Sequence, residues 1–149
     1  MTIASYLSQD LVRFLEVTSQ AEAIAELVQC LADAGRLLDS RDFHRAILER
    51  EKIVSTGIGL GVAIPHAKLI GYDDFFIAIG IQKGRAIPWQ SLDDAPVQII
   101  FMIGGPEDRQ TEYLSILSHL TSAIKDEERR KKLIKASHPK EVLAIFEGF

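Results

Sequence analysis

The sequence has few of the features that mark secreted or membrane proteins. Its single cysteine, Cys30, cannot form an internal disulfide, which agrees with a reducing compartment. The longest apolar runs fall far short of the roughly 20 residues that span a bilayer. The N-terminus also lacks a charged segment followed by an apolar one. We therefore expect a protein that is made and kept in the cytoplasm, without membrane insertion.

The sequence also lacks an excess of positive charge. A net charge of −4 and an isoelectric point near 5.6 argue against general nucleic-acid binding and are compatible with a partner that presents a basic or apolar patch. Apolar residues make up 47% and charged residues 26% of the chain, close to the averages of soluble proteins. A chain of 149 residues is of ordinary size for one domain, so we expect one domain over 1–149.

Metal-binding and nucleotide-binding patterns are missing. The four histidines, His44, His66, His119 and His138, are scattered, with no cysteine or acidic cluster at ligand spacing. A zinc site is therefore not expected. The glycine-rich stretch lacks the Lys-Ser/Thr ending of a phosphate-binding loop, and no serine or cysteine nucleophile motif occurs. We expect no metal and no cofactor, and we interpret Cys30 as a small helical residue rather than a nucleophile.

Hydrophobic periodicity predicts strands interleaved with helices, which is typical of the α/β class. We expect a single domain with a mixed β-sheet of about five strands and helices on both faces. The capping-box pair Ser19 and Glu22 begins the first helix, and Gly35 ends it. The expected strands are 12–15, 62–64, 75–82 and 97–103, with a brief extended piece at 87–89, and the expected helices are 19–34, 40–52, 110–125, 127–135 and 141–146. In the helix over 110–125 the predicted inner stripe is Tyr113, Leu114, Leu117, Leu120, Thr121 and Ile124.

The most informative stretch runs from Ser55 to Leu69. It spaces Gly57, Gly59 and Gly61 two residues apart, and glycine tolerates positive φ and close approach of other groups. We therefore expect a loop whose backbone N–H groups point inward. Pro65 has no N–H to offer a strand partner, so the short strand before it should end there. This places His66 just beyond a strand end, beside the glycine loop.

The chemistry of this stretch centres on His66. An imidazole is largely neutral near pH 7, and it could accept a phosphoryl group where N–H groups and a cation face it. Arg50, at the C-terminal end of the second predicted helix, has the fork geometry to be that cation. In the alternative reading His66 is only hydrogen-bonded at a strand end, and Arg50 caps its own helix or pairs with a nearby acid.

These residues carry a resemblance to a known family. Gly-x-Gly-Val-Ala-Ile-Pro-His-Ala, preceded by Leu48-Glu49-Arg50-Glu51 and Ser55-Thr56-Gly57, resembles the phosphohistidine motif of the enzyme IIA domains of the bacterial phosphotransferase system, in their mannitol/fructose and nitrogen-regulatory class. The stretch from Ile87 to Val97, the apolar run that ends at Pro106 and the helix from Leu114 to Asp126 also fall in the family's order. Nearly the whole chain is covered.

The resemblance implies a role for each site residue. His66 would take a phosphoryl group from the histidine phosphocarrier protein on Nε2, with its other ring nitrogen tied to a backbone carbonyl. The family's α/β fold agrees with the periodicity. The phosphoryl oxygens would be held by Arg50, by Ser55 or Thr56, and by the backbone of Gly57, Gly59 and Gly61.

The chain departs from the family at one position. Members commonly carry a second histidine near the start of the helix after the apolar strand, and Tyr113 stands there instead. Tyr113 can donate a hydrogen bond to a phosphoryl oxygen but cannot become a cation at neutral pH. It could equally be packed on the inner stripe. His119 lies six residues on, about 120° around the helix, so we expect it on the surface.

Two functions follow from the resemblance. In the first, the protein is a phosphoryl carrier that passes the group to a cysteine of a IIB domain, as sugar-specific relatives do. In the second, it is a regulatory module of the nitrogen-type branch whose phosphorylation state, or mere presence, controls a target protein. We favour the regulatory branch, because no IIB or membrane domain occurs in these residues and because of Tyr113, which could also weaken or abolish phosphotransfer.

Overall fold

A six-stranded mixed sheet lies at the centre of the computed structural model, which describes residues 2–91 and 93–149. The strand order is β1-β5-β6-β3-β2, and β4 also pairs with β6. β6 is antiparallel to β5 and parallel to both β3 and β4. The expected strands 12–15, 62–64 and 75–82 are present, and the one expected over 97–103 runs from Ile99 to Pro106. The extended piece expected at 87–89 forms only an isolated bridge between Ile87 and Val97, whereas two strands, β2 and β4, were not expected. The bounds are β1 Val12–Leu15, β2 Gly57–Gly59, β3 Val62–Ala63, β4 His66–Leu69, β5 Phe76–Gln82 and β6 Ile99–Pro106.

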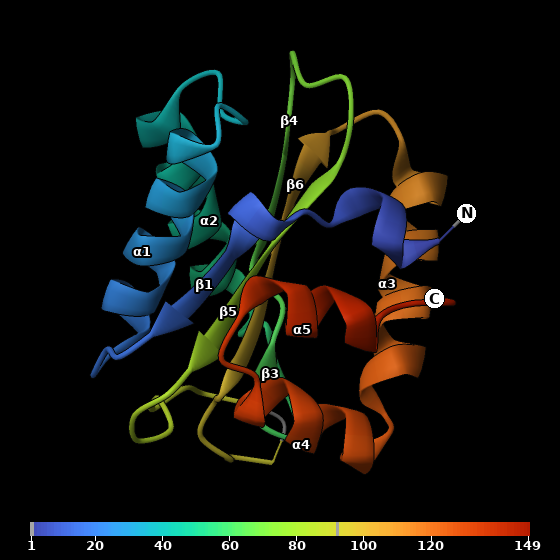
Figure 1. The fold of residues 1–149 in the computed structure, drawn as a ribbon. Helices are drawn as coiled ribbons and strands as arrows, with labels where there is room; N and C mark the ends of the chain where they lie inside the picture. Colours follow the sequence, from blue (N-terminus) through green and yellow to red (C-terminus); the bar gives the residue numbers. More distant parts are fainter. Residues whose placement is uncertain (1, 92) are drawn as a thin grey trace.

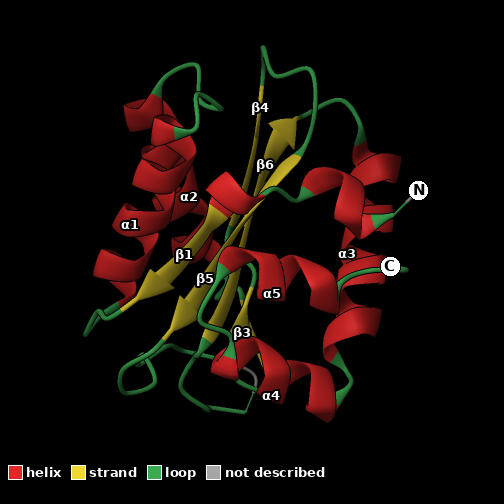
Figure 2. Ribbon diagram, viewed as in Figure 1, coloured by secondary structure: helices red, strands yellow, loops and turns green. Residues whose placement is uncertain are grey.

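Helices cover both faces of the sheet, as expected (Figure 1). Figure 2 shows α1 and α2 on one side and α3, α4 and α5 on the other. The first and last segments of the chain lie close together, and the Ala4 N–H donates a hydrogen bond to the Phe149 carbonyl at 3.2 Å. Among the described residues, no helix is both long and apolar enough to cross a membrane. The helices are η1 Ile3–Tyr6, η2 Gln9–Leu11, α1 Gln20–Asp33, α2 Ser40–Ile53, α3 Gln110–Ile124, α4 Glu127–Lys135 and α5 Pro139–Ile145.

The helix ends follow the capping chemistry. The Ser19 side chain accepts a hydrogen bond from the Glu22 N–H at 3.2 Å and so caps α1. Gly35 follows the C-cap of this helix with φ of 73°, the left-handed conformation that glycine adopts most readily. For α2 the cap is Asp39, one residue before the expected start. The predicted limits of α1 and α2 are therefore confirmed to within a residue or two.

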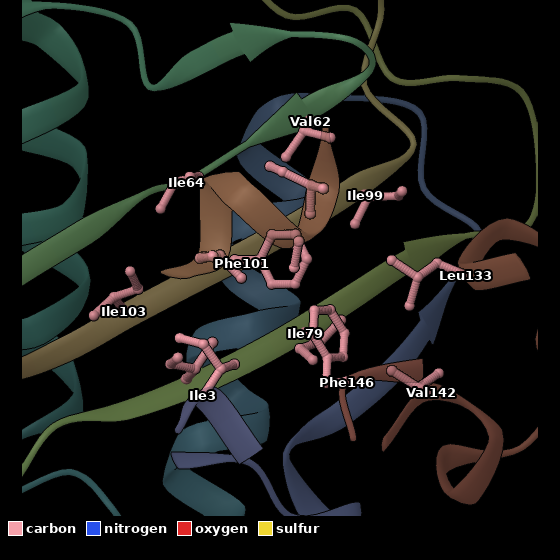
Figure 3. Close-up of a cluster of buried hydrophobic side chains, with 14 of the residues drawn as sticks. Ile3, Val62, Ile64, Ile79, Ile99, Phe101, Ile103, Leu133, Val142 and Phe146 are labelled. Atoms are coloured by element: carbon pink, nitrogen blue, oxygen red, sulfur yellow. The ribbon is translucent and has the colours of Figure 1, made fainter. Parts of the chain in front are cut away.

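Each face of the sheet carries its own hydrophobic core. Every residue of β5 and of β6 is buried, which is typical of strands covered on both sides. Phe76 and Ala78 pack toward α1 and α2, whereas Ile77 and Ile79 pack toward α3, α4 and α5. Figure 3 shows part of the core under α3, α4 and α5, where the rings of Phe101 and Phe146 pack edge to face with their centroids 5.8 Å apart.

The predicted inner stripe of α3 was partly wrong. Its buried residues are Tyr113, Ile116, Leu120, Ala123 and Ile124. Leu114 is 53% exposed. The buried stripe is rotated around the helix, so that Leu114, Leu117 and Thr121 lie on a flank that is left open. The open flank forms a wall of the cleft described below.

The glycine stretch forms a hairpin rather than a loop of inward-pointing amides. β2 and β3 pair in antiparallel fashion, and the turn between them has positive φ at Gly59, Leu60 and Gly61. Pro65 ends β3, as predicted, but the chain resumes pairing with β6 at once as β4. His66 therefore lies just beyond the end of a strand, as expected, but it is also the first residue of the next strand.

Two expected features touch residues outside the described ranges. Met1 belongs to the predicted domain 1–149, and Leu92 belongs to the stretch from Ile87 to Val97.

Candidate functional site

An open cleft of about 450 Å³ lies between α3, the C-terminal end of α2 and the start of β4. It brings together five of the eight site residues expected from the sequence. Its lining residues are Arg50, Ser55, Thr56, Ile58, Ile64, His66, Tyr113, Leu114, Leu117, Ser118 and Thr121.

The His66 ring is fixed by its own chain. Nδ1 lies 3.0 Å from the carbonyl oxygen of Ile64, two residues earlier. A carbonyl only accepts hydrogen bonds, so Nδ1 donates and carries the proton of the neutral ring. Nε2 is then left with its lone pair. Ile64 and Pro65 lie between β3 and β4, so the histidine is bonded to the short piece of chain that joins the two strands.

The surroundings of His66 keep it unprotonated. Burial lowers the pKa of the imidazole, and the positive charges of Arg50 and Lys68 lower it further. The hydrogen bond to Ile64 and the negative charge of Glu51 act in the opposite direction, but the pKa remains below the ordinary histidine value. The ring is therefore neutral near pH 7.

Arg50 lines the cleft from the last turn of α2. Its Nη1 donates a hydrogen bond to the Val54 carbonyl at 2.9 Å, so the capping interaction considered for it exists. The same side chain is close enough to shift the pKa values of both His66 and Tyr113. No ion pair within the described ranges uses Arg50. Its charge is thus available to an anion in the cleft.

Ser55 and Thr56 lie at the floor of the cleft and are already hydrogen-bonded. The Ser55 hydroxyl donates to the Gln90 carbonyl and accepts from the Gly57 N–H. The Thr56 hydroxyl donates to the carboxylate of Glu51 at 2.6 Å, and its N–H bonds the same carboxylate. Both hydroxyls retain lone pairs, but a phosphoryl oxygen needs a donor, so either would have to rearrange to bind one.

Glu51 holds this floor in place and was not predicted. Besides Thr56, its Oε1 accepts hydrogen bonds from Gln20 Nε2 at 3.0 Å and from Trp89 Nε1 at 2.9 Å. The carboxylate therefore joins α1, α2, the cleft floor and the segment after Pro88. Nothing local in the sequence predicts these partners, because they lie 5, 31 and 38 positions away from Glu51.

The three glycines do not line the cleft, contrary to the expectation for Gly57, Gly59 and Gly61. A Cβ on Gly57 would lie 2.7 Å from the Gln90 carbonyl oxygen, and the Leu60 N–H donates to Asp93. Gly57 and Gly59 are needed for a tight hairpin that lies against Gln90, Ser91 and Asp93. The glycine spacing indicated correctly that another group lies close to this backbone, but that group is another part of the chain and not a phosphoryl group.

Tyr113 occupies the position expected from the resemblance. It is 4% exposed, and its ring centroid lies 5.3 Å from that of His66 and 6.1 Å from that of Phe75. Burial raises the pKa of its phenol to about 12, despite the opposing charge of Arg50. The hydroxyl is therefore protonated at neutral pH. Tyr113 is both a packed aromatic residue and a lining residue of the cleft, so its geometry is compatible with a packing role and with a hydrogen-bond donor role.

The other histidines lie elsewhere. His119 is half-buried rather than fully on the surface, with Nδ1 2.8 Å from the Ser115 carbonyl, and it does not line the cleft. His138 accepts a hydrogen bond from the Lys140 N–H and caps α5, while His44 lies on α2. In the part of the chain that the structure describes, no group of three or more His, Cys, Asp or Glu side chains could hold a metal ion.

Comparison with known proteins gives a consistent result. The family described as "Phosphoenolpyruvate-dependent sugar phosphotransferase system, EIIA 2" matches residues 5–148. The chain is 36% identical over 146 residues to the fructose-specific EIIABC component of the phosphotransferase system of Bacillus subtilis. That alignment covers 97% of this chain but 23% of the relative, so the chain spans less than a quarter of that protein.

Solved structures agree with this match. The nitrogen regulatory protein IIA-Ntr of Neisseria meningitidis superimposes with a TM-score of 0.89 at 30% identity, over 97% of this chain and 98% of that one. The fold also matches the complex of enzyme IIAMTL and phosphorylated enzyme IIBMTL of Escherichia coli, with a TM-score of 0.81 at 18% identity, over 96% of this chain and 98% of that one.

Proposed function

Because the chain belongs to the EIIA 2 family of the phosphoenolpyruvate-dependent sugar phosphotransferase system, we propose that it carries a phosphoryl group on Nε2 of His66. The observation that carries this proposal is the bond between Nδ1 and the Ile64 carbonyl at 3.0 Å. It leaves the lone pair of Nε2 free in a cleft that also contains Arg50. The donor is the histidine phosphocarrier protein, as expected for the family.

The transfer needs no proton movement at His66. The Nε2 lone pair forms the new N–P bond, and the donor nitrogen keeps the electron pair of the N–P bond that breaks. The proton stays on Nδ1, which continues to donate its hydrogen bond to the Ile64 carbonyl. Because such transfer depends mainly on positioning and on stabilisation of the phosphoryl charge, a fixed ring and a nearby cation supply most of what the reaction requires.

The cleft residues divide this work between them. Arg50 lies unpaired with any carboxylate in the described residues and has two parallel donors for phosphoryl oxygens. The protonated Tyr113 phenol adds a neutral donor. Ser55 and Thr56 shape the floor and donate only if their present hydrogen bonds to Gln90 and Glu51 exchange.

The experiment is phosphorylation with purified components. The protein is incubated with phosphoenolpyruvate, enzyme I and the histidine phosphocarrier protein, and the label is tested for the acid-labile, base-stable behaviour of phosphohistidine. We expect one phosphoryl group per chain, absent from His66→Ala. His44→Ala and His119→Ala are matched controls that remove an imidazole outside the cleft and should label normally. An unlabelled wild-type chain, or a labelled His66→Ala variant, would refute the proposal.

The acceptor distinguishes the two branches. We propose the nitrogen-type regulatory branch, which the 0.89 TM-score with a IIA-Ntr protein supports. The 36% identity with a fructose-specific component supports the sugar-specific alternative, in which the group passes to a IIB cysteine. Adding a fructose-type or mannitol-type IIB domain to the labelled protein decides between them. Rapid loss of label to the IIB thiol would favour the sugar branch, and retention would favour the regulator.

A further inference from the structure

Lys68 lies on the same face of β4 as His66. Side chains alternate along a strand, so residues 66 and 68 share one face while Ala67 points to the other. Ala67 packs into the core under α1 and α2, which confirms that His66 and Lys68 face α3. The strand register therefore fixes a cationic side chain beside the imidazole.

Two groups of α3 hold the Lys68 ammonium without neutralising it. Nζ lies 4.3 Å from the centroid of the Tyr113 ring and donates a hydrogen bond to Gln110 Oε1. No carboxylate among the described residues forms an ion pair with it. A π face and an amide oxygen attract the ammonium but leave its full charge, whereas a carboxylate would cancel it.

The same tyrosine ring contacts His66. Its centroid lies 5.3 Å from that of the imidazole, so Tyr113 touches both the histidine and the lysine. Tyr113 is buried and packed against Phe75, so the ring is a fixed platform. Lys68 is also close enough to His66 for its positive charge to lower the pKa of the imidazole.

We propose that Lys68, held on the Tyr113 ring, is the second cation that stabilises the phosphoryl group on His66. This inference rests on the proposed function. Arg50 lines the cleft from α2, and Lys68 on β4 lies outside the cleft lining but over the Tyr113 ring that His66 contacts. The charge of a phosphoryl group on Nε2 would thus be balanced by cations from two elements. In a half-buried site such a charge is screened less than at the open surface, so its effect is appreciable.

The test uses a donor that has no docking surface. Phosphoramidate phosphorylates histidine directly, so its rate reports the site and not recognition of a protein partner. We expect Lys68→Met, which keeps most of the side-chain stem, to label His66 about tenfold more slowly than the wild type. The equilibrium with the phosphorylated phosphocarrier should shift against His66 by a similar factor. Lys68→Arg should restore most of both losses.

A matched control and a platform variant complete the design. Lys83 also lies over an aromatic ring, that of Phe14, at 5.6 Å, and Lys83→Met makes the same change in net charge away from the cleft. It should label at the wild-type rate. Tyr113→Phe keeps the ring that holds the ammonium and should retain the Lys68 effect, whereas Tyr113→Leu should reduce labelling as Lys68→Met does.

The outcomes separate this inference from the proposed function. If the wild type is not labelled, the phosphoryl-carrier proposal itself fails. If the wild type and Lys68→Met are labelled by phosphoramidate at the same rate, only the role of Lys68 is refuted. A Lys68→Met variant that changes only the KM for the phosphocarrier would also refute it, because Lys68 would then be a docking residue.

Discussion

Replacing Glu51 by leucine should destabilise the protein substantially, because one carboxylate satisfies donors from three separate segments. It accepts bonds from the Thr56 hydroxyl at 2.6 Å, from Trp89 Nε1 at 2.9 Å and from Gln20 Nε2 at 3.0 Å. Thr56 and Trp89 are each only 6% exposed. A buried donor without a partner costs about 1–3 kcal/mol. Since water can reach part of this site, we expect a loss of about 3 kcal/mol in the free energy of unfolding.

Urea unfolding measures this loss directly, and thermal unfolding should show it as a fall in Tm of about 6–12 °C for a chain of this size. Glu49→Leu is the control, because Glu49 is exposed on the same helix and its replacement should change stability by less than about 0.5 kcal/mol. A loss below about 1 kcal/mol for Glu51→Leu, or one equal to that of the control, would refute the reasoning that the carboxylate organises the cleft floor.

Three further predictions concern other parts of the site. Folding lowers the pKa of His66 from 6.5, so as pH falls below 6.5 the unfolded chain binds this proton more readily than the folded chain does. The free energy of unfolding should therefore be highest above pH 6.5 and decline as pH falls. Unfolding measured between about pH 5 and pH 7 should show this slope in the wild type but not in His66→Gln. Tyr113→His should raise the phosphorylation rate, and an unchanged rate would assign Tyr113 to packing alone. Gly57→Ala should lower the free energy of unfolding in urea by about 1–3 kcal/mol, since the new Cβ would lie 2.7 Å from the Gln90 carbonyl oxygen. Gly84→Ala is the control, because its Cβ has room, and should lower it by less than about 0.5 kcal/mol. Equal losses would contradict the steric argument.

The sequence was most informative where local chemistry decides the structure. The capping pair at Ser19 and the strand end before Pro65 each depend on residues within one element, and both predictions were confirmed. The apolar run predicted a strand buried on both faces correctly, but β6 spans Ile99–Pro106 rather than 97–103. That His66 and Arg50 line the same cleft was predicted from a motif that spans the end of one helix and the start of a strand. The resemblance to the family added Tyr113, which the periodicity alone placed on the inner side of its helix.

The remaining features depend on tertiary contacts. Leu114 was expected in the core, but it is exposed because this flank of α3 faces the cleft. The glycine spacing was interpreted as a phosphate-binding loop, because nothing in it reveals that Gln90, Ser91 and Asp93 lie against these glycines. Glu51 has four partner atoms from three segments, and Lys68 touches residues some 40 positions away. No local pattern encodes such pairings.

The break at Pro65 has a consequence for how a carrier of this kind can operate. Because the Ile64 oxygen and the imidazole belong to the same short piece of chain, the ring's tautomer is set locally, before any other molecule arrives. If His66 carries the phosphoryl group as proposed, accepting it and passing it on would both leave the Nδ1 proton in place, so neither step would need an added proton donor or acceptor at this ring. The direction of flow would be decided only by which neighbour, upstream or downstream, is the more heavily charged with phosphate.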